Sequence, residues 1–528
     1  MSGLMLAAVA ALPAGAAAAG SVRRLRGMAP VLSVGAAVLA AALGVALAVT
    51  VAVGGPVEVV LATPDGRVWT GLVVDHVGAI VLLLVCAVSA VVQAFALRYL
   101  RGDPAAARFA IAAGALTAAT TAMVTAATIV TLAVAWSLTG VILCRLVGIY
   151  RPAPSAVDAT RRTARAVVIG DVALWVGVVL AVAAWGDLDL RHQSSNTAVG
   201  GPLGTVVACL LVVAASARCA QLPWHRWLPA SLAAPTPVSA LLHAGVVNAG
   251  GVLLVKLAPI VGAAPVATHL VFAIGAVSVV AATTIMLARP DVKGALVHST
   301  IGQMGFMLVT CGLGLYAAMV VHLVAHGLFK ATLFLGSGSA VQRYTRHTVA
   351  PPAPRLAPAR AAQVAVFAGV AGVAAVAVAA WWLPPHAGGA ALLVFAVATA
   401  ARLAWGWLRR YPTAGALVTV VIVLPGAAIG YLAVVGAVAE FLAPSLPAAG
   451  PAAVSAWLLA TVVVVLAAGA LLLHLAPANG LRRWRDRLYV LALSAGQQRT
   501  HAATWGHPPR PGAGPAPEAG PQLEGARA

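Results

Sequence analysis

One lysine in this chain lies inside an apolar stretch, although only three lysines occur against thirty arginines. Lys330 follows His326 by four residues and His322 by eight, within the segment VHLVAHGLFKATLFLG. That spacing places the three side chains on one face of a helix. An amine removed from water and an imidazole can both release a proton near neutral pH, whereas a guanidinium keeps its proton. The three residues therefore predict a path for protons at membrane depth. Simple packing explains them less well, because a lysine at the centre of a span costs a few kcal/mol.

A second group of candidates lies where prolines interrupt apolar sequence. From Ala217 to Gly251 the chain reads ARCAQLPWHRWLPASLAAPTPVSALLHAGVVNAGG, and its four prolines predict that one helix ends or breaks and another begins. Broken backbone at membrane depth is tolerated where protein buries it or where it lines a wet cavity, and broken helices often build ion sites. His243 lies in the span that follows. It is either part of such a site or a core histidine whose neighbours satisfy it.

A third group lies in RPDVKGALVHSTIGQMGFM, which begins at Arg289. Lys293 is near the start of the expected span, and His298 and Gln303 lie deeper. Polar groups at that depth are costly unless they pair or face water, so they could extend the path of Lys330. Taken alone, Lys293 is better explained as an anchor whose ammonium reaches the membrane surface, and we expect Lys256 to be an anchor too.

Acidic residues are scarce inside the expected spans. Asp171, in AVVIGDVALW, is the clearest case, and we expect it to pair with a nearby base such as Arg218 or Arg165. A structural ion pair explains Asp171 and Arg218 as well as a functional one does.

No metal, cofactor or catalytic residue is predicted. The five cysteines show no metal-ligand spacing, and the two aligned histidines have no third ligand cluster beside them. A glycine-rich dinucleotide motif is also missing, which argues against a redox enzyme with its own cofactor.

The composition requires membrane helices to position these groups. The chain is 62% apolar and 9% charged, with a mean hydropathy of +0.98, which excludes a soluble globular protein. Apolar runs long enough to cross a bilayer recur along it, so we predict an all-α polytopic membrane protein with about 13–15 transmembrane helices. The expected spans are 3–20, 29–53, 75–98, 105–121, 123–147, 163–185, 203–222, 235–257, 265–287, 293–313, 316–341, 361–382, 389–408, 413–436 and 453–476.

The net charge of +20 reflects topology and does not indicate a nucleic-acid partner. The basic residues form short clusters in alternate loops, as the positive-inside rule requires of cytoplasmic loops. This pattern predicts a bacterial cell-membrane protein with its N-terminus outside and its C-terminus in the cytoplasm. It also favours an apolar first helix over a signal peptide, because RRLR follows the first apolar run.

Three segments outside the spans have expected structures of their own. The alternating pattern of 55–72 predicts an external β-hairpin with a turn at Pro64–Gly66. The stretch 479–490 reads as a basic amphipathic helix on the inner membrane surface, and 506–528 as a disordered tail.

The three motifs together resemble the proton-translocating antiporter-like family. The resemblance is strong over about 205–342 and rests on LPWHRWLPASLAAPTPVSALLHA, DVKGALVHSTIGQMGFM and HLVAHGLFKATLFLGSGS. This family includes the L-, M- and N-type membrane subunits of respiratory NADH:quinone oxidoreductase and the Mrp-type sodium/proton antiporters. LLHAGVVNAGG and QMGFMLVTCGLG look most like the DabB-type membrane subunits of bacterial inorganic-carbon pumps.

The resemblance implies an antiporter-like fold with two inverted five-helix repeats, broken helices and a buried route for protons. The route would consist of Lys330, His326, His322, His243, His298 and Lys293. A DabB-type subunit would conduct H⁺ or Na⁺ to drive inorganic-carbon uptake by a DabA-like zinc subunit on the cytoplasmic face. The alternative is a respiratory or Mrp-type subunit. The chain would divide into N-terminal helices with the hairpin (1–104), an antiporter-like core (105–342), C-terminal helices (343–476) and a cytoplasmic helix with tail (477–528).

Two positions depart from the respiratory members of the family. Arg218 stands where they have a lysine, and Ser137 follows Trp136 where they have a glutamate. The usual glutamate–lysine couple is therefore expected to be lost from the first half-channel. A guanidinium sets a local potential but does not relay a proton, and a scaffold that has lost transport would show the same departure.

Overall fold

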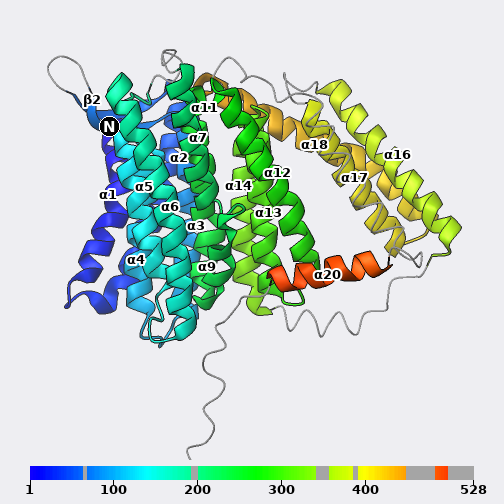
Figure 1. Cartoon of the computed structure of the whole chain (residues 1–528), viewed down its shortest axis with the longest axis horizontal. Helices are drawn as coiled ribbons and strands as arrows, with labels where there is room; N and C mark the ends of the chain where they lie inside the picture. The colour runs from blue at the N-terminus through cyan, green and yellow to red at the C-terminus, as the bar shows by residue number, and fades with distance from the viewer. Residues whose placement is uncertain (63–67, 192–199, 340–355, 384–389, 447–481, 497–528) are drawn as a thin grey trace, which may run out of the picture.

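The computed structural model describes residues 1–62, 68–191, 200–339, 356–383, 390–446 and 482–496. Twelve helical segments in these ranges are long and apolar enough to cross a membrane, and they stand side by side (Figure 1). The expected all-α polytopic membrane fold is confirmed. The long helices are α1 (Ser2–Ser21), α2 (Ala29–Gly54), α3 (His76–Tyr99), α4 (Ala106–Val124), α5 (Ile129–Val147), α6 (Pro154–Trp185), α7 (Gly201–Arg218), α12 (Pro265–Ala288), α13 (Val292–Gly312), α14 (Tyr316–Leu335), α16 (Pro358–Trp382), α17 (Ala390–Arg410) and α18 (Ala414–Leu442).

The expected spans agree with these helices up to α18. Helices α13 and α17 have the length of a span but carry more polar residues, and they are not among the twelve. Helix α6 begins at Pro154, nine residues before the expected start, because its first turns are polar and lie outside the apolar run. The last expected span, 453–476, and the expected tail, 506–528, lie outside the described residues.

Several helices begin at residues whose side chains cap them. The Gly78 amide donates to Asp75 Oδ1 over 2.6 Å at the start of α3, and the Gly294 amide donates to Asp291 Oδ2 over 2.6 Å at the start of α13. Such caps satisfy backbone N–H groups that have no partner within the helix. They fix where each helix enters the membrane and therefore the depth of the polar residues it carries.

The proline-rich segment breaks the chain as expected. After α7 come the short α8 (Trp227–Ala230) and then α9 (Thr236–Ala244), η5 (Val246–Asn248) and α10 (Ala249–Lys256). Pro237 lies at the start of α9, where a missing N–H costs nothing. Helices α9 and α10 together make one interrupted crossing that is buried almost throughout. This crossing packs against α14 and α3, at the centre of the larger bundle.

One end of the bundle carries a small sheet. Strands β1 (Val57–Ala62) and β2 (Val68–Val74) pair antiparallel, with Val57 opposite Val74, as the expected hairpin requires. Its expected turn at Pro64–Gly66 lies outside the described residues. Leu72 forms a further bridge with Ala126 in the loop between α4 and α5. We call this the hairpin end. Its loops close over the bundle and are bound to one another by backbone hydrogen bonds.

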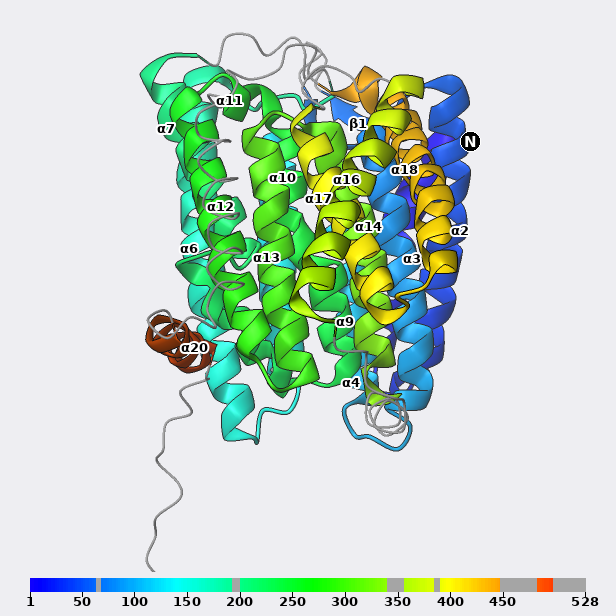
Figure 2. The same ribbon diagram turned by 90° about the vertical axis from the view of Figure 1, so that its right-hand side faces the viewer.

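The opposite end carries most of the basic residues between helices, and we call it the arginine-rich end. Helix α20 (Arg482–Gly496) lies across α12 and α13 there, and the Arg289 guanidinium donates to the Gly496 carbonyl over 3.0 Å (Figure 1). The expected amphipathic helix is thus present. Helices α16, α17 and α18 form a second group with its own apolar core and stand beside α14 (Figure 2).

Candidate functional site

The buried face of α14 carries Lys330 into the centre of the larger bundle. The Lys330 side chain is fully buried. Its ammonium donates to the Leu296 carbonyl over 3.2 Å and to the Ser299 hydroxyl, both on α13. Among the described residues, no carboxylate forms an ion pair with it. A buried ammonium that has only neutral acceptors is costly to keep charged.

His326 lies one turn from Lys330 on the same face and contacts two other helices. Its Nε2 is 3.0 Å from the His243 carbonyl of α9, and its Nδ1 is 2.9 Å from Gln303 Oε1 on α13. A neutral imidazole donates from one nitrogen and accepts at the other. The Gln303 amide can turn to present either its oxygen or its NH₂ group. It can therefore satisfy the charged as well as the neutral form of His326.

His322 continues the face by one further turn toward the hairpin end. Its Nε2 is 3.1 Å from the Gln303 carbonyl, and its ring centroid is 6.0 Å from that of His326. The structure thus brings Lys330, His326 and His322 together, as their spacing predicted. Each of the three has a hydrogen-bond partner on α13, which runs antiparallel to α14.

The break after α9 brings His243 to the same place. Its Nδ1 is 3.1 Å from the Thr300 hydroxyl, its ring stacks on Phe334 at 4.2 Å, and its Nε2 has no partner among the described residues. Since α9 ends at Ala244, the His243 carbonyl is among the last four of the helix and is free to face His326. Gly327 permits this approach, because a Cβ there would lie 2.9 Å from the Ala244 carbonyl.

The remaining two path candidates lie nearer the arginine-rich end. The Lys293 ammonium donates to the Thr236 hydroxyl over 3.1 Å, and the Tyr99 hydroxyl lies 3.1 Å from the same oxygen. His298 is buried, but its Nδ1 pairs with the Gly294 carbonyl of its own helix at 2.9 Å. Neither residue makes a direct hydrogen bond to Lys330 or His326. They lie along α13 between the Lys330 group (Lys330, His326, His322 and His243) and the arginine-rich end of the bundle.

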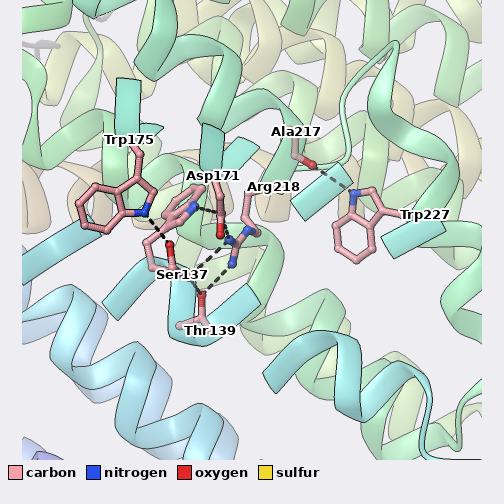
Figure 3. A network of polar contacts seen from close by, with 8 residues as sticks. Ser137, Thr139, Asp171, Trp175, Ala217, Arg218 and Trp227 are labelled. Carbon is pink, nitrogen blue, oxygen red and sulfur yellow. Dashed lines mark hydrogen bonds and ion pairs between the residues drawn. The ribbon is translucent and has the colours of Figure 1, made fainter. Parts of the chain in front are cut away.

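A separate buried group surrounds Arg218 at the last residue of α7 (Figure 3). Its Nη2 lies 3.1 Å from Asp171 Oδ1 on α6, and its Nη1 donates to the Thr139 hydroxyl over 2.7 Å. The guanidinium also lies over the Trp136 ring, 4.3 Å from the centroid, and the Trp136 indole N–H donates to Asp171 Oδ1 over 2.8 Å. The expected pairing of Asp171 with Arg218 is confirmed.

The segment after Arg218 connects the two groups. The Cys219 thiol donates to the Val247 carbonyl in η5 over 3.1 Å, and the Gln221 amide donates to the Ile301 carbonyl of α13 over 3.2 Å. Ile301 directly follows Thr300, which contacts His243. The Arg218 group and the Lys330 group are therefore joined by hydrogen bonds through η5 and α13.

Comparison with known protein families identifies the fold. Residues 126–409 match the family model described as NADH:quinone oxidoreductase/Mrp antiporter, TM, and residues 62–110 match that of NADH-Ubiquinone oxidoreductase (complex I), chain 5 N-terminus. The first match covers more than half of the chain. The chain belongs to the NADH:quinone oxidoreductase/Mrp antiporter family. The resemblance of its three motifs to antiporter-like proteins is therefore confirmed.

Individual members of the antiporter family show the range of the match. The chain is 37% identical over 296 residues to the probable inorganic carbon transporter subunit DabB1 of Halothiobacillus neapolitanus, covering 54% of this chain and 52% of that one. It is 32% identical over 279 residues to NAD(P)H-quinone oxidoreductase chain 5 of Synechocystis sp., covering 51% and 41%. The chain thus spans about half the length of the curated relatives it matches.

The solved Mrp complex of Dietzia sp. DQ12-45-1b has the same fold. It is 23% identical, with a TM-score of 0.59, and the match covers 94% of this chain and 60% of that one. The antiporter-like fold with broken helices is thereby supported over nearly the whole chain.

The Arg218 group contains the two positions that depart from the respiratory members of the family, or lies beside them. Ser137 does not contact the guanidinium and instead accepts from the Trp175 indole N–H over 3.0 Å. A carboxylate still lies beside the cation, but it is Asp171 from α6 and not a residue beside Trp136 on α5. The couple expected to be lost is therefore replaced by an aspartate–arginine pair.

Among the described residues, no group of three or more potential ligands could hold a metal ion.

The prediction for Lys256 is wrong. This residue was expected to be an interface anchor, but only 4% of it is exposed. Its ammonium donates to the Ala126 carbonyl over 3.4 Å, beneath the loops of the hairpin end. The rarity of lysine in the chain could have marked Lys256 as unusual. Its burial, however, depends on the loop at Ala126, which no local sequence pattern reveals.

Proposed function

We propose that this chain is the cation-conducting membrane subunit of an inorganic-carbon uptake complex. The observation that supports conduction best is the Lys330 group, in which a buried amine without a carboxylate partner lies one turn from His326. The similarity to DabB1 of Halothiobacillus neapolitanus supports the choice of inorganic carbon. The cation is a proton, because the groups present are titratable nitrogens.

In the proposed path, a proton enters near Lys293 and passes to the Lys330 amine. The next carrier is His326, whose Cβ lies about 6 Å from that of Lys330, as for any i, i+4 pair. Gln303 turns its amide to follow the charge of His326, and His322 carries the proton one turn further. His243 supplies the carbonyl that accepts from His326 Nε2, and its own Nε2 offers a further acceptor. We place His298 at the entry, beside Lys293.

Lys256 extends the proposed path toward the hairpin end. A cavity of about 40 Å³ lies beside the break between α9 and α10, bordered by α3, α4, α9, α10 and α14. Asn248, Ser89 and Thr117 contribute polar groups to its wall, and Asn248 Oδ1 has no partner within the described part of the chain. Such a volume accommodates two or three waters at about 15 Å³ each. Water there would lie beside the break between α9 and α10, where Asn248 faces it.

The orientation of the chain follows from the same proposal. The arginine-rich end faces the cytoplasm of a bacterial cell, as the positive-inside rule favours, and a DabA-like zinc subunit docks on that face. Residues 105–342 form the conducting core, and the segments before and after it flank that core.

A respiratory or Mrp-type role is the alternative, and the similarity to chain 5 of the Synechocystis oxidoreductase favours it. Co-purification of the tagged full-length chain from its native membrane distinguishes the two roles. We expect a zinc-containing soluble protein as the main partner, and restored growth in low CO2 when both are expressed in a host that requires high CO2. Recovery with respiratory membrane subunits and NADH-driven quinone reduction would instead assign the chain to a respiratory complex.

Replacing Lys256 by methionine is expected to reduce proton flux about tenfold, because a stepwise path loses its carrier near the hairpin end. Flux is measured with a pH-sensitive dye in proteoliposomes that contain the purified complex. Asp75→Asn is the companion variant at the same end of the bundle, since asparagine still caps α3. Wild-type flux in Lys256→Met would remove this residue from the path and leave the Lys330 group unaffected.

A further inference from the structure

We propose that the arginine-rich end holds a binding site for one anionic phospholipid, between α1, α4 and α5. The structure has a cavity of about 500 Å³ at this position. Its charged wall comes from four separate segments of the chain: Arg26 after α1, Arg108 in α4, Arg145 in α5, and Arg151 in the loop that follows α5. The proposal concerns a lipid and is independent of which complex the chain serves.

The positive charge of this cavity favours binding of an anion. Its lining contains four guanidinium groups and, within the described residues, no carboxylate. Four like charges around one space repel one another unless an anion lies between them. Guanidinium groups bind phosphate oxygens in pairs, with two parallel N–H···O bonds from each arginine. A phosphate at the centre of the cavity would satisfy this geometry.

Asp103, on which the charge of Arg108 acts, does not neutralise the cavity. Asp103 accepts from the Tyr150 hydroxyl over 2.6 Å and from the Ala105 amide over 2.7 Å. These bonds, with a smaller contribution from the charge of Arg108, lower the pKa of Asp103. It is therefore ionised at neutral pH and balances at most one of the four arginines. A net charge of about +3 remains at the site.

The apolar wall indicates that the anion carries acyl chains. On α4, Arg108 shares one helix face with Ile111, Ala112 and Ala115, at spacings of three, four and seven residues. Arg145 ends a similar stripe on α5 that begins three turns deeper in the bilayer. Its members are apolar side chains at spacings of four, three and four residues that are 47–53% exposed: Val134, Leu138 and Val141.

Both stripes run from membrane depth to an arginine at the same cavity. A soluble phosphate would bind the arginines but would not contact the apolar stripes, whereas a phospholipid would contact both. Basic pockets between transmembrane helices are known to hold acidic headgroups for this reason. The site therefore fits a phosphate headgroup among the four arginines with its acyl chains along α4 and α5.

Native mass spectrometry of the full-length protein in lipid nanodiscs tests the site. With equal amounts of phosphatidylglycerol and phosphatidylcholine, we expect the wild type to retain phosphatidylglycerol preferentially. Arg108→Gln/Arg145→Gln is expected to reduce that retention about twenty-five-fold, since each basic residue contributes about a factor of five. Arg23→Gln/Arg24→Gln is the matched control: it removes the same charge from the loop that carries Arg26, but from outside the cavity. It should retain the lipid as the wild type does.

A second variant separates lipid from free phosphate. Ala115→Trp fills the apolar wall and leaves all four arginines in place, so it should also lose phosphatidylglycerol. Inorganic phosphate at millimolar concentration should not displace the lipid from the wild type. Equal retention of both lipids by the wild type, equal loss in the control, or full displacement by inorganic phosphate would each overturn the proposal. Elution of every variant as a monodisperse peak in size-exclusion chromatography verifies folding.

Discussion

Replacing Lys330 by methionine is expected to abolish proton-coupled transport, with flux at the level of empty liposomes, while the protein still inserts and folds. Methionine has nearly the length of lysine and fills the buried space without the ammonium. The Leu296 carbonyl and Ser299 hydroxyl then lose only a donor on α13. Removing an uncompensated buried amine also removes its desolvation cost, so stability should not fall. The measurement is dye-reported proton flux in proteoliposomes that contain the purified complex.

Two further variants identify what Lys330 does. Lys330→Arg keeps the positive charge but not the ability to release a proton, so it should fail as methionine does if the amine is a carrier. Leu328→Ala is the matched control on α14, because Leu328 is half exposed and lies away from the buried face. Full activity of Lys330→Arg would show that the residue acts as a fixed charge. Wild-type flux in Lys330→Met would exclude it from the path altogether.

The sequence predicted the Lys330 group because helix spacing alone places His322, His326 and Lys330 on one face. It also predicted the break after α9, since the prolines there admit few other structures. Both features are local. The partners on α13 were not predicted in the same detail: Gln303 was noted as a deep polar residue, but its position between two histidines depends on the antiparallel packing of α13 and α14.

Residues whose surroundings come from distant loops were predicted less well. Lys256 ends an apolar run and has the sequence context of an anchor, yet the loop at Ala126 covers it. The aspartate–arginine pair was expected, but its place as the counterpart of the family's glutamate–lysine couple was not. The family pattern pointed to Ser137 as a missing carboxylate, and only the packing of α6 against α7 shows that Asp171 supplies one.

The side chains of the Lys330 group and the Arg218 group suggest different functions for the two groups. The Lys330 group has titratable nitrogens with neutral acceptors, which suits the movement of a proton. The Arg218 group has a guanidinium with a carboxylate, a hydroxyl and an aromatic ring, which suits a fixed charge that holds α5, α6 and α7 together. The hydrogen bonds of Cys219 and Gln221 allow that fixed charge to position η5 and α13.

If Arg218 is a fixed structural charge, breaking its pair should chiefly reduce stability. Asp171→Asn keeps an acceptor for the Trp136 indole but removes the negative charge, and it leaves a guanidinium buried without its counter-ion. We expect the free energy of unfolding, measured by denaturant titration in mild detergent, to fall by about 3 kcal/mol. The double variant Arg218→Met/Asp171→Leu should lose less than the sum of its single variants, because it buries no unpaired charge.

The same set of single and double variants tests whether the Arg218 group is structural and the Lys330 group conducts protons. Variants of this pair that still fold should retain proton flux through the Lys330 group, since no proton passes through Arg218. Arg218→Lys keeps the ion pair but loses the fork that reaches Thr139 and much of the contact with the Trp136 ring, so it should cost about 1–2 kcal/mol and leave flux unchanged. Additive losses in the double variant would show that the two residues act independently. Loss of flux in a fully folded Arg218→Lys would show that the charge geometry at α7 gates the path, and the fixed-charge assignment would then be wrong.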